Sequence, residues 1–178
     1  GGGVVSCADG CACRVCLVEV EGARTLMASC ATPVTEGMVV RTASAKVRSA
    51  RKNVVELLLS EHNGDCPTCG LNDDCELQAG AREVGVEEHR WEGERAHAHM
   101  DNSTPALVRD NGKCIKCRRC VSVCGEIQSV GGLFPQGRGF ATHVGPAFTL
   151  DLDGVTCVQC GQCAAVCPVG AIQERSHI

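Results

Sequence analysis

Residues 114–124 read CIKCRRCVSVC, and residues 157–167 read CVQCGQCAAVC. Both stretches have the spacing C-x2-C-x2-C-x3-C, and the second repeats the first at an offset of 43 residues. Two copies of one unit in a short chain indicate duplication of a ligand-binding element. The repeat decides the fold of residues 113–178, because eight cysteines at these intervals are spaced as metal ligands.

This spacing is that of the bacterial two-cluster ferredoxin, in which the fourth cysteine of each run binds the cluster of the other run. Three thiolates on a tight loop bind one face of a cubane, and the fourth ligand comes from the other half. The repeat therefore predicts two [4Fe–4S] clusters. The first predicted ligand set is Cys114, Cys117, Cys120 and Cys167, and the second is Cys157, Cys160, Cys163 and Cys124.

Sixteen cysteines among 178 residues have three interpretations: disulfides, zinc or iron–sulfur clusters. Disulfide scaffolds are typical of short secreted proteins, but GGGVVSCADG at residues 1–10 has neither the basic start nor the apolar stretch of an export signal. Zinc sites commonly use two C-x2-C pairs. Two four-cysteine runs, one of them followed by Pro168, fit a ferredoxin better. A zinc-binding structural module remains the alternative.

The remaining composition excludes other classes of protein. A formal net charge of −4 argues against nucleic-acid binding, and no apolar run approaches the roughly 18 residues of a membrane span. With one Trp, three Phe and no Tyr, few aromatic side chains are available to fill a core, and bound metal is expected to hold the fold. No G-x-G-x-x-G motif indicates a nicotinamide site, so we expect no catalytic site in this chain.

Residues 13–42 are predicted to be β-rich, with turns at Glu21-Gly22 and Glu36-Gly37. Residues 44–60 are predicted to form a helix capped by Ser44. Residues 85–112 are polar, and we expect a connector there. The predicted apolar stripe of the helix is Val47, Ala50, Val54, Leu57 and Leu58, and its predicted solvated basic face is Lys46, Arg48, Arg51 and Lys52.

A histidine precedes a third group of cysteines in the pattern His62-x3-Cys66-x2-Cys69-x5-Cys75. Three thiolates leave a four-ligand site one ligand short. Imidazole is a good ligand for iron, but a histidine near cysteines is often only solvated. The spacing alone leaves both roles open for His62.

The H-x3-C-x2-C-x5-C run resembles the histidine-ligated [4Fe–4S] site of a family of iron–sulfur proteins. That family comprises the large iron–sulfur subunit of respiratory complex I, related subunits of NAD-linked formate dehydrogenases and nickel–iron hydrogenases, and the N-terminal region of multi-cluster [FeFe]-hydrogenases. The stretches GDCPTCGLNDDCELQ, ACRVCLVEVEGARTL and SCATPVTEGMVV carry the resemblance, which extends over essentially the whole chain. DNSTPALVRDNGKCIKCRRCV, GRGF, VGPAF and CPVGAI are most similar to the [FeFe]-hydrogenase branch of the NAD(P)-linked multisubunit type.

The resemblance implies an α+β chain of three cluster-binding parts. Residues 1–42 are expected to form a partial plant-type [2Fe–2S] ferredoxin-like β domain, incomplete at its N-terminus. Residues 43–84 are expected to form a small helical domain whose [4Fe–4S] cluster is bound by His62, Cys66, Cys69 and Cys75. After the connector 85–112, residues 113–178 are expected to form the bacterial two-[4Fe–4S] ferredoxin-like domain.

Cys13, Cys16 and Cys30 match the last three [2Fe–2S] ligands of the family. The family spacing places the first ligand at or before Gly2, where this sequence has no cysteine. Cys7 with Cys13 and Cys16 is close to the plant-type C-x4-C-x2-C opening. Cys7 is therefore the expected fourth ligand, and Cys11 is the alternative.

One [2Fe–2S] and three [4Fe–4S] clusters imply an electron-transfer chain. The expected donor is a flavin or NAD(P)H-oxidising iron–sulfur subunit, or a ferredoxin, and the expected acceptor is a hydrogenase catalytic domain or subunit. Complex I, formate dehydrogenase and a nickel–iron hydrogenase diaphorase are the alternatives. We expect a hetero-oligomer without a transmembrane segment, located in the cytoplasm because such clusters require a reducing compartment.

Overall fold

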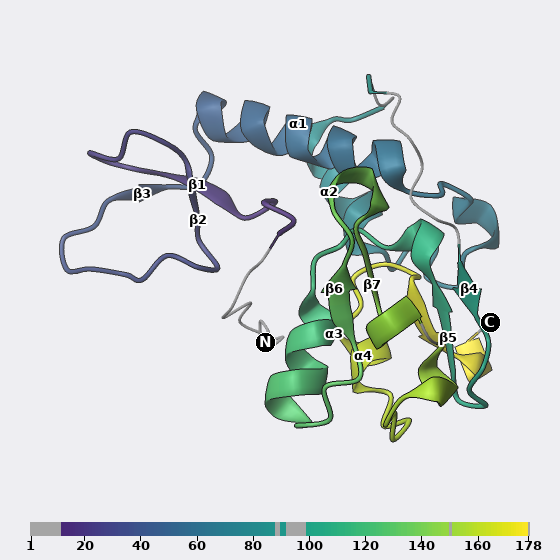
Figure 1. Ribbon diagram of the computed structural model, residues 1–178. Helices are drawn as coiled ribbons and strands as arrows, with labels where there is room; N and C mark the ends of the chain where they lie inside the picture. The colour runs from purple at the N-terminus through teal and green to yellow at the C-terminus, as the bar shows by residue number, and fades with distance from the viewer. Residues whose placement is uncertain (1–11, 88–89, 92–98, 150, 178) are drawn as a thin grey trace.

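The computed structural model describes residues 12–87, 90–91, 99–149 and 151–177. Figure 1 shows a small N-terminal sheet at one end, the long helix α1 leading away from it, and a C-terminal unit that contains most of the short elements. The described chain is thus a mixed α and β structure, as the sequence predicts.

The N-terminal sheet has β1 (Leu17–Val20) in its centre, antiparallel to β2 (Met27–Ala28) on one side and to β3 (Val40–Arg41) on the other. Gly22 and Gly37 occupy the connecting turns with φ of 84° and 76°. Only glycine adopts this backbone conformation without strain. The predicted hairpin and the second predicted turn are therefore confirmed.

Helix α1 (Ala45–Glu61) begins as predicted, because Ser44 Oγ accepts a hydrogen bond from the Val47 N–H at 3.3 Å. Val47 and Val55 are fully buried. The predicted apolar stripe is wrong at Leu57, which is 52% exposed.

The buried position next to Leu57 belongs to Glu56, whose side chain is 1% exposed. Its carboxylate accepts a hydrogen bond of 2.7 Å from Arg90 Nε. An ion pair with a residue 34 positions away explains how a carboxylate can occupy a buried place on this helix. A stripe of apolar residues cannot indicate such a partner.

The predicted solvated face of α1 is wrong at two residues. Arg51 donates from Nε and Nη2 to the Leu17 carbonyl at 3.1 and 2.9 Å, which ties α1 to β1. Lys52 Nζ donates to the Gly85 carbonyl at 2.8 Å. Gly85 ends helix α2 (Glu76–Val84), so both basic side chains join α1 to neighbouring elements.

The C-terminal unit contains a sheet of β4 (Met100–Asp101), β5 (Leu107–Asp110) and β8 (Ile172–Glu174), with β5 in the centre. Strands β4 and β5 lie within the expected connector 85–112, yet β5 pairs with the last strand of the chain. The second half of that polar segment is therefore part of the C-terminal unit.

The rest of the C-terminal unit consists of a two-stranded ribbon and two short helices. Strand β6 (Phe134–Gln136) pairs with β7 (His143–Gly145). Helices α3 (Arg119–Ser122) and α4 (Gln162–Ala165) each lie within one cysteine run, and a π-helical turn at Val123–Ile127 follows α3. Both helices occupy the same position in the repeat.

Two groups of buried side chains form the interior. The first packs the C-terminal unit and contains Leu107, Cys120, Val123, Leu133, Val144, Leu152, Cys163 and Ile172. The second, here named the shared core, contains Val55, Leu77, Val169 and Ala171. Because its members come from α1, α2 and the segment after Cys167, the helical unit and the C-terminal unit pack on one interior.

Candidate iron–sulfur cluster sites

The two cysteine runs have the same local conformation. Lys116 and Arg118 in the first run have positive φ, and so do Gln159 and Gly161 at the same offset in the second. Left-handed residues reverse the chain within a few positions. Each run therefore places its first three cysteines on one tight loop that leads into a short helix.

The first loop lies against a cavity in the C-terminal unit, next to β5 and β7. Lys116 donates its backbone N–H to Cys114 Sγ at 3.4 Å. Val144, Val169 and Ile172 make much of the wall apolar. The cysteines that line this cavity are Cys114, Cys117, Cys120 and, from the second run, Cys167.

The second loop lies against an equivalent cavity. Gly132 donates its backbone N–H to Cys124 Sγ at 3.2 Å, and Cys160 is exposed to solvent. The cysteines that line this cavity are Cys157, Cys160, Cys163 and, from the first run, Cys124. Each cavity thus combines three cysteines of one run with the fourth of the other.

Burial makes the thiolate form of these cysteines unfavourable in the absence of a bound cation. Burial, and then the neighbouring cysteines, raises the pKa of Cys117 and of Cys163 to about 12. Burial also raises the pKa of Cys120 well above its usual value. Because the thiolate is the form that binds metal, the buried negative charges require a compensating cationic group such as cluster iron.

His62 caps the C-terminus of α1, where its backbone N–H donates to the Leu59 carbonyl at 3.2 Å. Burial lowers the pKa of His62, while a hydrogen bond between the ring and the Lys113 backbone raises it less. The imidazole is therefore neutral near pH 7, and Nδ1 is buried with no hydrogen-bond partner among the described residues. A buried neutral imidazole with an unpaired ring nitrogen can serve as a metal ligand.

The three cysteines after His62 lie on a turn and a helix start. Cys66 begins the 3-10 turn Cys66–Thr68, Cys69 follows it, and Cys75 precedes α2. A Cβ added to Gly170 would lie 2.5 Å from Cys69 Sγ. A side chain at position 170 would therefore fit only if Cys69 Sγ moved, and the Cys69 loop reaches the segment just after Cys167.

The described cysteines do not gather around one point. Within the described ranges, no group of three or more His, Cys, Asp or Glu side chains is placed to hold a single metal ion. A zinc ion needs thiolate sulfurs about 3.8 Å apart around one point, whereas a cluster spreads its thiolates over its corners. Each described cysteine is a free thiol.

In the N-terminal unit, Cys13, Cys16 and Cys30 are half-buried. The Sγ atoms of Cys16 and Cys30 are 3.1 Å apart and share a hydrogen bond. Burial and this contact raise the pKa of Cys30 to about 11. The two candidates for the fourth ligand, Cys7 and Cys11, lie outside the described residues.

Three family models match separate parts of the chain. A 2Fe-2S iron-sulfur cluster binding domain matches residues 5–45, the NADH-ubiquinone oxidoreductase-G iron-sulfur binding region matches residues 51–90, and a 4Fe-4S dicluster domain matches residues 113–171. The three regions and their order agree with the predicted cluster types.

The chain also resembles one solved structure over nearly its full length. A chain in the crystal structure of an NAD+-reducing [NiFe]-hydrogenase in the H2-reduced state superposes with a TM-score of 0.84 and 30% identity. The match includes 94% of this chain and 70% of that chain. The protein belongs to the NADH-ubiquinone oxidoreductase-G family of iron–sulfur proteins.

Two curated proteins are also similar to this chain over most of its length. The chain is 49% identical, over 93% of its length, to NADP-reducing hydrogenase subunit HndD of Solidesulfovibrio fructosivorans. It is 36% identical, over 93% of its length, to the mitochondrial NADH-ubiquinone oxidoreductase 78 kDa subunit of Neurospora crassa. It spans 28% and 22% of these two relatives.

This member of the oxidoreductase-G family resembles subunits of an NADP-reducing hydrogenase and of NADH-ubiquinone oxidoreductase over its iron–sulfur regions. It has regions for both [2Fe–2S] and [4Fe–4S] clusters. Among the helices that the structure describes, none is long and apolar enough to cross a membrane.

One functional feature of this chain escaped the sequence analysis. Arg109 is 3% exposed and lines the cavity of the first cysteine loop together with Asn111. In β5 the burial alternates, so that Leu107 and Arg109 share the inward face. The sequence LVRD at residues 107–110 lies between two polar stretches. Reading it as a strand with alternating faces would have predicted that Arg109 is buried beside Leu107.

Proposed function

We propose that this chain relays single electrons between a flavin or NAD(P)H-oxidising iron–sulfur partner, or a ferredoxin, and a hydrogenase active site. The observation that carries the proposal is the pair of cavities, each lined by four cysteines from both runs. Iron–sulfur clusters supply reversible one-electron reduction when bound at such sites.

In this proposal, the residues of the chain bind these groups. We assign one [4Fe–4S] cluster to each of the two cavities and a third to the histidine-containing segment. The [2Fe–2S] cluster belongs to the N-terminal unit. The proposed ligands in chain order are Cys7, Cys13, Cys16 and Cys30, then His62, Cys66, Cys69 and Cys75, then Cys114, Cys117, Cys120 and Cys167, and finally Cys124, Cys157, Cys160 and Cys163.

Contacts between the units support a continuous path. The Glu76 backbone N–H donates to the Pro168 carbonyl at 3.0 Å, and Arg119 binds the Glu76 carboxylate through two hydrogen bonds of 2.6 and 2.7 Å. Asn63 donates its backbone N–H to the Gly112 carbonyl at 2.7 Å. These contacts lie at residues adjacent to Cys75, His62 and Cys167, so they fix the separation of the proposed cluster sites.

The proposed partners follow from the relatives. A higher identity to a subunit named as an NADP-reducing hydrogenase than to a ubiquinone-linked subunit, 49% against 36%, favours a hydrogenase as the acceptor. We propose that the chain acts in a hetero-oligomer, because its curated relatives are named as subunits. We place it in the cytoplasm, because reduced thiolates and clusters persist in a reducing compartment.

The test is anaerobic purification followed by metal analysis and reduction. We expect a brown protein with about 14 iron atoms per chain and a visible absorption that dithionite bleaches. We also expect bleaching by NADPH or NADH only when the flavin-containing partner subunit is added. A colourless protein with about one zinc per four cysteines, as in closed structural sites, would refute the proposal.

A further inference from the structure

The cavity of the first cysteine loop has a buried guanidinium in its wall. Arg109 lies on the central strand β5, and its side chain is 4% exposed. It lines the same cavity as Cys114, Cys117, Cys120 and Cys167. An arginine remains charged under all ordinary conditions, so this cavity contains a permanent positive charge away from water.

The hydrogen bonds of Arg109 leave its Nε–H without a partner among the described residues. Nη1 donates to Asn111 Oδ1 at 2.7 Å and to the Val144 carbonyl at 3.0 Å. Nη2 faces Asp101 Oδ2 at 3.4 Å. Nε is buried and has no hydrogen-bond partner among the described residues. Since buried donors are nearly always paired in native proteins, the unused N–H points to a missing acceptor.

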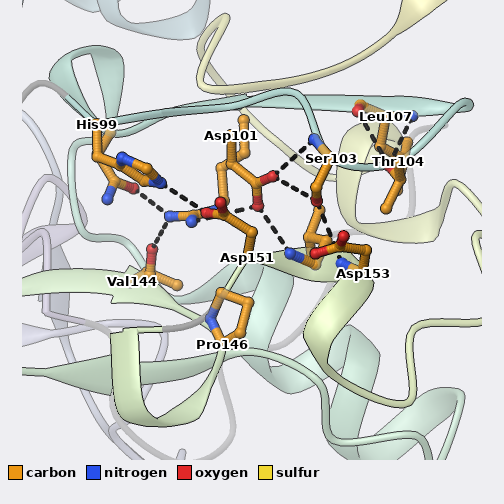
Figure 2. Close-up of polar contacts among 12 residues, drawn as sticks. His99, Asp101, Ser103, Thr104, Leu107, Val144, Pro146, Asp151 and Asp153 are labelled. Carbon is orange, nitrogen blue, oxygen red and sulfur yellow. Dashed lines mark hydrogen bonds and ion pairs between the residues drawn. The ribbon is translucent and has the colours of Figure 1, made fainter.

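The carboxylate of Asp101 offsets only part of the Arg109 charge on the cavity side. Asp101 accepts hydrogen bonds from the N–H and hydroxyl of Ser103 at 3.0 and 2.7 Å, as Figure 2 shows. It also accepts one from the Leu152 N–H at 2.9 Å. Burial raises the pKa of Asp101, but these bonds and Arg109 outweigh it and leave the pKa below its usual value. Asp101 is therefore ionised, shared among several donors, and absent from the cavity wall.

Gly145 makes room for the guanidinium. A Cβ added there would lie 3.0 Å from Arg109 Nη1 and 3.4 Å from its Cζ. The neighbouring Val144 supplies the carbonyl that Nη1 binds. The VGP stretch at residues 144–146 thus fixes the guanidinium in position against the cavity.

We propose that Arg109 raises the reduction potential of the cluster bound by Cys114, Cys117, Cys120 and Cys167, by donating its free Nε–H to a sulfur atom there and by placing a fixed positive charge beside it. Reduction adds negative charge to a cluster, and both effects stabilise the reduced form. The low polarity of the wall strengthens them. This inference deepens the proposed function and rests on that ligand set.

A redox titration of the anaerobically loaded full chain, followed by electron paramagnetic resonance, tests the inference. Cys120→Ser identifies the signal of the first-cavity cluster. Arg109→Met is expected to lower the reduction potential of that cluster alone. At a fixed ambient potential, the ratio of reduced to oxidised cluster should fall about tenfold. For a one-electron couple this fall corresponds to a shift of about 59 mV. Arg109→Lys, which retains a charge but loses the Nε–H, is expected to give a smaller shift.

Two further variants sharpen the test. Arg118 lines the same cavity but is only half-buried, so water screens its charge. Arg118→Met is therefore the matched control and is expected to give less than half the shift of Arg109→Met. Asp101→Asn removes the counter-charge and is expected to shift the same cluster in the opposite direction, which general damage to the fold would not do.

Unchanged potentials in Arg109→Met, or equal shifts of all clusters, would overturn the inference. If Arg109→Met does not take up iron, the other two variants decide. Unchanged cluster potentials in both Arg109→Lys and Asp101→Asn would then overturn the inference. Failure of the proposed function looks different, because the wild-type chain would then lack iron in the first cavity. Full iron content with unaltered potentials rejects only the role of Arg109.

Discussion

Replacing Gly170 by alanine tests whether Cys69 binds iron or only packs against its neighbours. The added Cβ would lie 2.5 Å from Cys69 Sγ, about 1 Å inside the roughly 3.5 Å at which heavy atoms make favourable contact. A free thiol escapes by rotating its side chain, at a cost of about 1 kcal/mol. A thiolate bound to iron cannot move so far, because ligand distances tolerate only about 0.2 Å.

The expected result for Gly170→Ala is therefore loss of the cluster bound by Cys69 with retention of the fold. Iron content should fall by about four atoms per chain, the content of one cubane, and one signal should disappear from the electron paramagnetic resonance spectrum of the reduced protein. Circular dichroism should change little. Gly64→Ala is the matched control, because nothing lies within 4 Å of a Cβ added there. Wild-type iron content and an unchanged spectrum in Gly170→Ala would show that Cys69 is not a ligand.

Three other outcomes follow from the same structure. His62→Cys should lower the midpoint potential of one cluster, because a thiolate adds negative charge to it, and an unchanged potential would reject His62 as a ligand. Val55→Ala in the shared core should lower the free energy of unfolding, measured by denaturant titration, by about 2 kcal/mol. Leu57→Ala on the exposed side of α1 should change it by less than about 0.5 kcal/mol. Iron removal should abolish amide protection in residues 60–80 and 113–178, because metal binding and folding are coupled; native-like protection in hydrogen exchange without metal would contradict this.

The repeat predicted the C-terminal unit well because cysteine spacing constrains the backbone directly. Left-handed residues recur at the same offset, at Lys116 and Gln159 for example, and Cys167 lines the cavity of the first run as the crossed arrangement requires. The cap at Ser44 was equally local, since the residues that form it lie three positions apart. The identities of the ligands, including His62, remain predictions.

Partners distant in sequence were beyond prediction. Glu56 is buried because Arg90 reaches it, and Arg51 binds the Leu17 carbonyl across 34 positions. The strands in residues 100–110 are short, and β5 pairs with β8, which lies at the other end of the C-terminal unit in sequence. Arg109 was overlooked because its burial depends on a network of Asp101, Asn111 and Val144 that no periodic pattern encodes.

The shared core bears on how such chains are assembled in evolution. Residues 51–90 and 113–171 match two different family models, which suggests two interchangeable parts. Yet Val55 and Leu77 from the first pack against Val169 and Ala171 from the second. A gene rearrangement that acquired only one part would leave these apolar surfaces facing water. Selection should therefore keep residues 51–90 and 113–171 together when genes recombine. The shared core does not include the N-terminal unit, so recombination can exchange that unit more easily.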